Sequence, residues 1–192
     1  MKSLINIKSL RSAFTEILSI VIGVLLALAV NEWNENRVQT ARANEAIKNI
    51  NQEIASNIAL LKIVHTNNTK VLAIIDGSEG SEDGPDKQQQ FIPGLQIQDT
   101  AWQTLLSTGV SEYIEFSKLY EMSAIYSIQD IYKKLGFQFV QTMMSNQALL
   151  KTLAPEKEAF KKNDLYIENM TLIVEVEKGL LSLYQKHNKP KS

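Results

Sequence analysis

The feature that most constrains this chain is a long apolar stretch near its N-terminus. It covers residues 17–30, and Glu16 is the last charged residue before it. A helix over residues 13–30 is about 27 Å long at about 1.5 Å per residue, close to the thickness of bilayer hydrocarbon. The sequence therefore predicts a transmembrane helix at 13–33, and no later stretch is apolar enough to form a second one.

Charged residues around this helix favour a cytoplasmic N-terminus. Residues 1–12 contain three basic and no acidic side chains, whereas Glu32 and Glu35 follow the helix, and Trp33 lies where an interfacial aromatic anchor is expected. We therefore expect a cytoplasmic tail at 1–12 and an extracytoplasmic domain after the helix. Three basic residues also occur in the twenty positions after Trp33, which leaves the reverse orientation open.

A cleaved signal peptide is the alternative to a retained membrane helix. Ala27, Leu28 and Ala29 have the small–x–small form of a cleavage site behind an apolar core. The helical pattern nevertheless continues past Ala29 without a break, which favours a retained transmembrane helix.

One face of the predicted transmembrane helix carries small residues at every fourth position. Ser19, Gly23 and Ala27, called the small-residue stripe below, would allow a partner helix to approach closely. They predict a helix–helix interface in the membrane, although small residues are common in all membrane helices. Glu16 lies near the same face, either as a functional carboxylate or as a side chain that reaches the headgroups.

Several segments of the chain carry a resemblance to a known family. They are EIL (16–18), IGVLLAL (22–28), NEWNENR (31–37) and, more loosely, AWQTLLSTG (101–109) followed by the Tyr-rich segment 119–132. Together they resemble an uncharacterised family of short bacterial single-pass membrane proteins, with Thr108 in place of a second Ser. The resemblance implies a bacterial inner-membrane protein with a helical periplasmic domain, and it implies no activity.

Beyond Trp33, apolar residues continue to recur every three or four positions up to Ile75, which predicts a long helix over 34–76. An acidic Gly/Pro loop follows at 77–97, and further bundle helices are predicted within 98–192. The predicted fold class is all-α, with one N-terminal transmembrane helix continuing into a long helix of a three- to four-helix extracytoplasmic bundle. Carboxylates in the loop leave open a bound cation, although their spacing does not fit an EF-hand.

Trp102 is the aromatic residue that the sequence singles out in the second half of the chain. It lies on the apolar face of a short helix that Asp99 or Thr100 would cap and Gly109 would end. Its helical spacing with Leu105 and Leu106 predicts a core anchor, and a binding role is the alternative.

The sequence offers little catalytic chemistry. It contains no cysteine and two histidines, His65 and His187, neither of which has a partner at the spacing of a zinc motif. His65 is therefore expected to be a packed or half-exposed residue and not a ligand. No nucleophile, phosphate-binding or dinucleotide motif occurs, so we expect no enzyme, no metal and no cofactor.

The charge balance excludes one class of partner. With a formal net charge of −1, the chain has no excess of basic residues to bind nucleic acid. We expect instead a membrane-anchored structural or accessory protein that binds the membrane and either its own copies or a membrane-protein partner. The alternatives are a sensory input bundle without an output domain of its own, and an ion-channel or stator-like subunit that uses Glu16.

Overall fold

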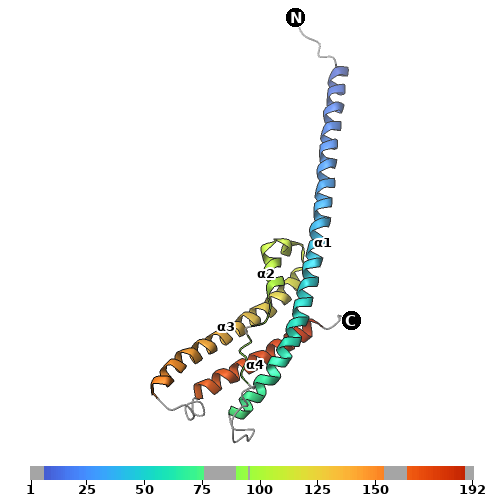
Figure 1. Ribbon diagram of the computed structural model, residues 1–192. Coiled ribbons are helices and arrows are strands. Elements are labelled where there is room, and N and C mark those ends of the chain that lie inside the picture. Colours follow the sequence, from blue (N-terminus) through green and yellow to red (C-terminus); the bar gives the residue numbers. More distant parts are fainter. Residues whose placement is uncertain (1–6, 76–89, 95, 154–163, 189–192) are drawn as a thin grey trace.

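The structure is a computed structural model that describes residues 7–75, 90–94, 96–153 and 164–188. Within these residues the protein is all-helical, which confirms the predicted class (Figure 1). The elements are α1 (Ile7–Ile75), α2 (Thr100–Ser107), the 3-10 helix η1 (Val110–Tyr113), α3 (Phe116–Leu153) and α4 (Asp164–His187).

The first helix, α1, is one continuous helix of 69 residues, or about 100 Å at about 1.5 Å per residue. It contains no proline and a single glycine, so nothing in its sequence removes a backbone hydrogen bond. Every residue at 14–38 is exposed, and this half stands apart from the other helices in Figure 1. In the described part of the chain, α1 is the one helix long and apolar enough to cross a membrane.

The second half of α1 forms a bundle with α3 and α4. Helix α4 packs against both α1 and α3, while α2 and η1 pack against α1 at the end of the bundle nearest its exposed half (Figure 1). Each fully buried aliphatic side chain contributes about 1.5–3 kcal/mol to this packing. The largest apolar side chains that are fully buried are Ile50, Ile54, Leu61, Leu105, Met122, Tyr132, Ile173, Leu180 and Tyr184.

Helix α2 is fixed by a stacked aromatic pair and by a side chain from α1. Trp102 is buried, and its ring stacks on that of Tyr126 in α3 at 5.0 Å between centroids. Asp99 occupies the N-cap position but makes no capping hydrogen bond there, because its carboxylate pairs with Lys133 at 2.9 Å. Glu53 of α1 takes over that role and accepts a hydrogen bond from the Ala101 amide at 2.8 Å.

Residues 90–94 and 96–98, called the connecting segment below, lie between α1 and α3 and form neither helix nor strand. A Cβ atom on Gly94, which has a φ of +66°, would lie 1.9 Å from the Tyr132 hydroxyl oxygen. A Cβ atom on Gly136 of α3 would lie 2.0 Å from the Pro93 carbonyl oxygen. Glycine at both positions therefore allows the segment to lie directly on α3. The acidic part of the predicted loop, residues 76–89, is outside the described residues.

Candidate functional site

The candidate site is a set of polar side chains inside the bundle. Five polar or charged residues are buried among the described residues, and all of them belong to α1, α3 or α4. Burying a polar group costs free energy unless it is hydrogen-bonded, so each side chain must have partners. The five buried residues are Glu53, Asn57, Asn68, Gln129 and Glu177.

Two asparagines of α1 bind the backbone of the connecting segment in the same way. The Asn68 amide nitrogen donates to the Ile92 carbonyl oxygen at 2.6 Å, and its Oδ1 accepts from the Ile92 amide at 2.8 Å. Asn57 repeats this pair with Gln98, at 2.7 Å and 3.0 Å. Each asparagine side chain thereby pairs with one backbone N–H and one backbone C=O of the connecting segment. The backbone of α1 could not bond to these groups, because its own N–H and C=O groups bond within the helix. The connecting segment therefore runs antiparallel to α1.

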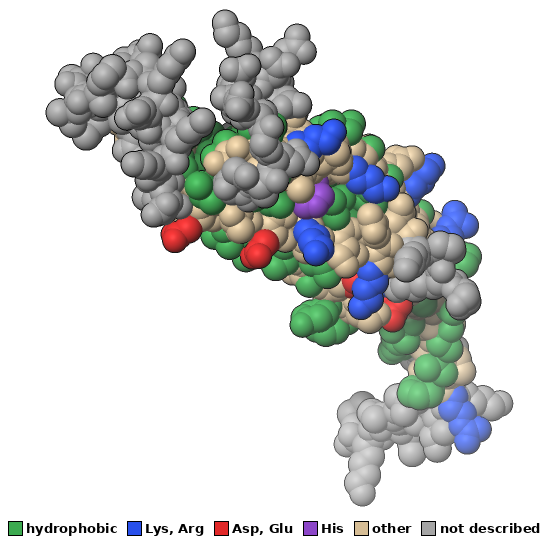
Figure 2. Space-filling view, turned by 90° about the horizontal axis from the view of Figure 1, so that it is seen from below, with side chains coloured by type: hydrophobic (Ala, Val, Ile, Leu, Met, Phe, Trp, Pro, Cys, Tyr) green, Lys and Arg blue, Asp and Glu red, His purple; other side chains and the backbone are tan. Residues whose placement is uncertain are grey.

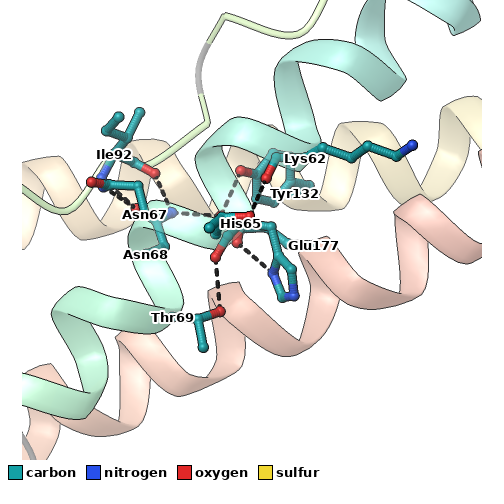
Figure 3. Close-up of polar contacts among 9 residues, drawn as sticks. Lys62, His65, Asn67, Asn68, Thr69, Ile92, Tyr132 and Glu177 are labelled. Carbon is teal, nitrogen blue, oxygen red and sulfur yellow. Dashed lines mark hydrogen bonds and ion pairs between the residues drawn. The ribbon is translucent and has the colours of Figure 1, made fainter. Parts of the chain in front are cut away.

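A carboxylate from α4 links this arrangement to the other helices (Figure 3). Glu177 is fully buried, and its Oε1 accepts hydrogen bonds from Asn68 Nδ2 at 2.7 Å and from the Tyr132 hydroxyl at 2.8 Å. Its Oε2 lies 3.1 Å from His65 Nδ1, and the His65 side chain is 25% exposed. These four residues, called the Glu177 cluster below, connect α1, α3 and α4 and reach solvent through the imidazole.

Burial dominates the electrostatics of this cluster. It raises the pKa of the Glu177 carboxyl above its ordinary value, and the hydrogen bonds from Tyr132, Asn68 and His65 offset only part of that effect. Burial likewise raises the pKa of the Tyr132 hydroxyl, and the adjacent Glu177 carboxylate adds to the shift. A buried carboxyl with a raised pKa, beside a partly exposed imidazole, is a candidate proton-binding site.

Three more polar contacts lie along the bundle toward α2. The Tyr184 hydroxyl donates to Gln129 Oε1, and Gln129 Nε2 donates to the Gln98 carbonyl oxygen at 2.7 Å. Nearer to α2, the Tyr126 hydroxyl donates to Glu53 Oε1 at 2.6 Å. Burial raises the pKa of both tyrosine hydroxyls above the ordinary value. Hydrogen-bonded polar groups therefore occur along the bundle from the Glu177 cluster to the start of α2.

Two hollows among the described residues are open grooves and not enclosed ligand pockets. One, of about 710 Å³, lies between α1 and α2. Amide and hydroxyl side chains form half of its lining, and Arg42 and Glu45 are among the charged residues there. Another, of about 470 Å³, lies between α3 and α4 beside Phe139 and Asn169. No three described His, Cys, Asp or Glu residues come close enough to hold a metal ion.

The site residues predicted from the sequence lie on different parts of the molecule. Glu16 and the small-residue stripe are exposed on the isolated half of α1. Trp33 is 67% exposed on the same half, with the Arg37 guanidinium 6.0 Å from its ring centroid. Trp102 is in the bundle core, and His65 is half-buried in the Glu177 cluster. Tertiary structure brings none of the predicted membrane residues into contact with the cluster.

Sequence reasoning missed Glu177 and Glu53 as important positions. A signal for both was present, because each shares the 3–4 spacing of the apolar residues around it. Glu177 lies four residues after Ile173 and three before Leu180, and Glu53 lies three after Ile50. An acidic residue on a buried helical face indicates a polar contact inside a core.

One face of the bundle, displayed in Figure 2, shows how the basic side chains are distributed. Figure 2 shows that Lys and Arg side chains on the displayed face are separated by polar and hydrophobic surface and form no continuous basic patch. No known protein family, no curated protein and no solved structure matches this chain.

Proposed function

We propose that this chain is a membrane-anchored structural or accessory protein, whose copies associate through the transmembrane helix and whose bundle binds protein partners. The observation that carries the proposal is the continuity of α1, which is exposed on all sides at 14–38 and forms a wall of the bundle from Ala43 onward. A helix of this kind holds a folded domain at a fixed distance from a bilayer. The proposal includes a bacterial inner membrane, a cytoplasmic N-terminus and a periplasmic bundle.

The direction of the small-residue stripe supports association through the membrane. Gly23 lies 27 positions before Ile50, and Ala27 lies 27 positions before Ile54. At about 3.6 residues per turn, 27 positions are about 7.5 turns, so the stripe faces away from the bundle side of α1. Ile50 and Ile54 are fully buried against the bundle. Two copies could therefore pack against each other through the stripe without a clash between their bundles.

Apolar side chains on the bundle surface support protein contacts outside the membrane. Phe116 is 79% exposed and Tyr120 is 70% exposed at the start of α3, and their rings stack on each other. Phe137 and Met144 are exposed farther along the same helix. Exposed large apolar side chains that lie together, such as Phe116 and Tyr120, are typical of surfaces that bind other proteins.

The experiment that tests self-association compares two identical substitutions in the full-length protein in nanodiscs. Ala27→Leu enlarges the small-residue stripe, whereas Ala29→Leu makes the same change about 200° around the helix. Native mass spectrometry should show that Ala27→Leu reduces the oligomer and that Ala29→Leu leaves it unchanged. Equal behaviour of the two variants, or a monomeric wild-type protein, would contradict association through this face.

A sensory input bundle is the second candidate function. The observation that favours it is the Glu177 cluster, because Asn68 and His65 of α1 contact a buried group of α4. A change in that contact would be transmitted to the membrane by α1, because α1 is one continuous helix. The test is crosslinking of the membrane helices at several pH values, with a change in crosslinking pattern expected of a sensor and a constant pattern expected of a scaffold.

A further inference from the structure

The Glu177 carboxylate is an unusual charge to place inside this bundle. It is 0% exposed, and in the described part of the chain its ion-pair partner is His65 and not a lysine or an arginine. Imidazole is the side chain whose charge changes near neutral pH, so a histidine supplies a positive charge only under some conditions. A buried carboxylate with this partner is fully neutralised only when the pair holds a proton.

The geometry of the pair suits a single shared proton (Figure 3). Oε1 is already used by two donors, Asn68 Nδ2 and the Tyr132 hydroxyl. Oε2 faces His65 Nδ1 at 3.1 Å, and this nitrogen donates or accepts according to its tautomer. A protonated Oε2 can therefore donate to a neutral imidazole without disturbing either contact at Oε1.

We propose that Glu177 and His65 form a proton-binding site that tightens the helical bundle when it takes up a proton and loosens it when the proton leaves. The titratable groups that face Glu177 are His65 from α1 and Tyr132 from α3, and the connecting segment faces the cluster through the Ile92 backbone. The inference goes beyond the proposed function, because it holds whether or not the protein associates with other copies.

The direction of the effect follows from burial. Burial raises the pKa of Glu177 in the folded protein, so the folded state binds this proton more tightly than the unfolded chain does. The stabilisation is fully present below the ordinary glutamate value and is lost as the pH rises through the higher folded value. Loss of the proton thus leaves a buried charge, whereas its uptake leaves a neutral carboxyl that keeps both contacts at Oε1.

Asn68 extends the consequence to the connecting segment. Its side-chain amide donates to Glu177 Oε1 and to the Ile92 carbonyl oxygen, while its Oδ1 accepts from the Ile92 amide. A loosened contact at Glu177 therefore frees the asparagine that holds this backbone. Hydrogen exchange at Ile92, corrected for the intrinsic pH dependence, should report the same change as global unfolding.

The test uses Glu177→Gln in the full-length protein in nanodiscs. A glutamine keeps an oxygen for Asn68 and Tyr132 and offers an N–H to His65, so it imitates the protonated carboxyl. From pH 5 to pH 8, the unfolding equilibrium constant of the wild-type protein should rise severalfold, because the folded chain loses a proton that it binds more tightly than the unfolded chain does. The variant should show no such rise and should be more stable than wild type at pH 8.

Controls separate this site from other acidic groups. Glu175→Gln changes an exposed carboxylate two residues away and should keep the wild-type pH dependence. An unchanged pH dependence in Glu177→Gln would overturn the proposal. A Glu177→Gln chain that does not fold would also overturn it, because glutamine imitates the protonated carboxyl that the proposal says stabilises the bundle.

Infrared spectra of the wild-type protein give an independent test. A buried protonated carboxyl that is present at pH 5 and lost by pH 8 supports the proposal, and its absence at pH 5 overturns it.

Discussion

Asn57 and Asn68 lie eleven positions apart on α1 and bind opposite ends of the connecting segment with the same pair of backbone hydrogen bonds. Eleven positions are about three helical turns, so both side chains point to the same face. The two asparagines are about 16 Å apart along the helix, and six extended residues can span about 20 Å, so the chain from Ile92 to Gln98 is long enough to reach both. The two pairs of hydrogen bonds hold Ile92 and Gln98 on this face of α1.

The first prediction concerns these two asparagines. Asn68→Ala removes the partners of one backbone N–H and one backbone C=O, each worth about 1–3 kcal/mol when left unsatisfied, so we expect a loss of at least about 2 kcal/mol. Asn57→Ala should behave similarly. Chemical denaturation followed by near-ultraviolet circular dichroism measures the loss. The control is Asn49→Ala, an exposed asparagine of the same helix, which should change stability by less than about 0.5 kcal/mol.

The second prediction compares two helical glycines. Gly136→Ala would place a Cβ atom 2.0 Å from the Pro93 carbonyl oxygen, and a backbone contact of this kind costs about 1–3 kcal/mol to relieve. Gly179→Ala on α4 meets no atom within 4 Å, and alanine favours the helix by up to about 1 kcal/mol. Thermal unfolding should therefore shift in opposite directions for the two variants. A stabilised Gly136→Ala protein would show that the connecting segment does not lie on α3.

The third prediction concerns alkaline unfolding. Burial raises the pKa of the Tyr126, Tyr132 and Tyr184 hydroxyls, so the folded state keeps protons that the unfolded chain releases near pH 10. These three hydroxyls should leave the stability unchanged below that pH and should make it fall as the pH rises above it. Ultraviolet absorbance follows the ionisation of these three tyrosines. We expect them to ionise only at the pH at which Trp102 fluorescence shows that the core unfolds.

A matched variant checks the tyrosine assignment. Tyr184→Phe removes one buried phenol, so the fall in stability with alkaline pH should become shallower. Ionisation of all tyrosines while the bundle remains folded would disagree with their burial.

The fourth prediction separates assembly from ion conduction at Glu16. Glu16→Gln removes the charge at the edge of the apolar stretch without changing its size, so we expect an unchanged oligomeric state. Gly23→Ile adds a branched side chain to the small-residue stripe and should reduce the oligomer. Native mass spectrometry measures both variants. Ion flux into vesicles that is present in the wild-type protein and lost in Glu16→Gln would favour a channel over a scaffold.

Much of the fold could be predicted from local patterns. The apolar stretch at 17–30 and the 3–4 spacing from Ala43 to Ile75 are properties of neighbouring residues, and they predicted a long, apolar N-terminal helix in an all-helical protein. Gly109, with a φ of +71°, follows α2 where a helix stop was expected. The cap of α2 differed, because Glu53 replaces Asp99 as the acceptor, and the 3-10 helix η1 was not predicted.

By itself, the sequence determined which segments are helical and which of them is apolar enough to enter a membrane, because helix periodicity and hydropathy depend on residues close together in the chain. Only the tertiary structure decided that Glu177 is a buried hub. Its partners Asn68 and His65 are 109 and 112 positions away, and no local pattern records which distant side chains will meet. The same reason hides the path of the connecting segment, which depends on two asparagines and two glycines from three separate parts of the chain.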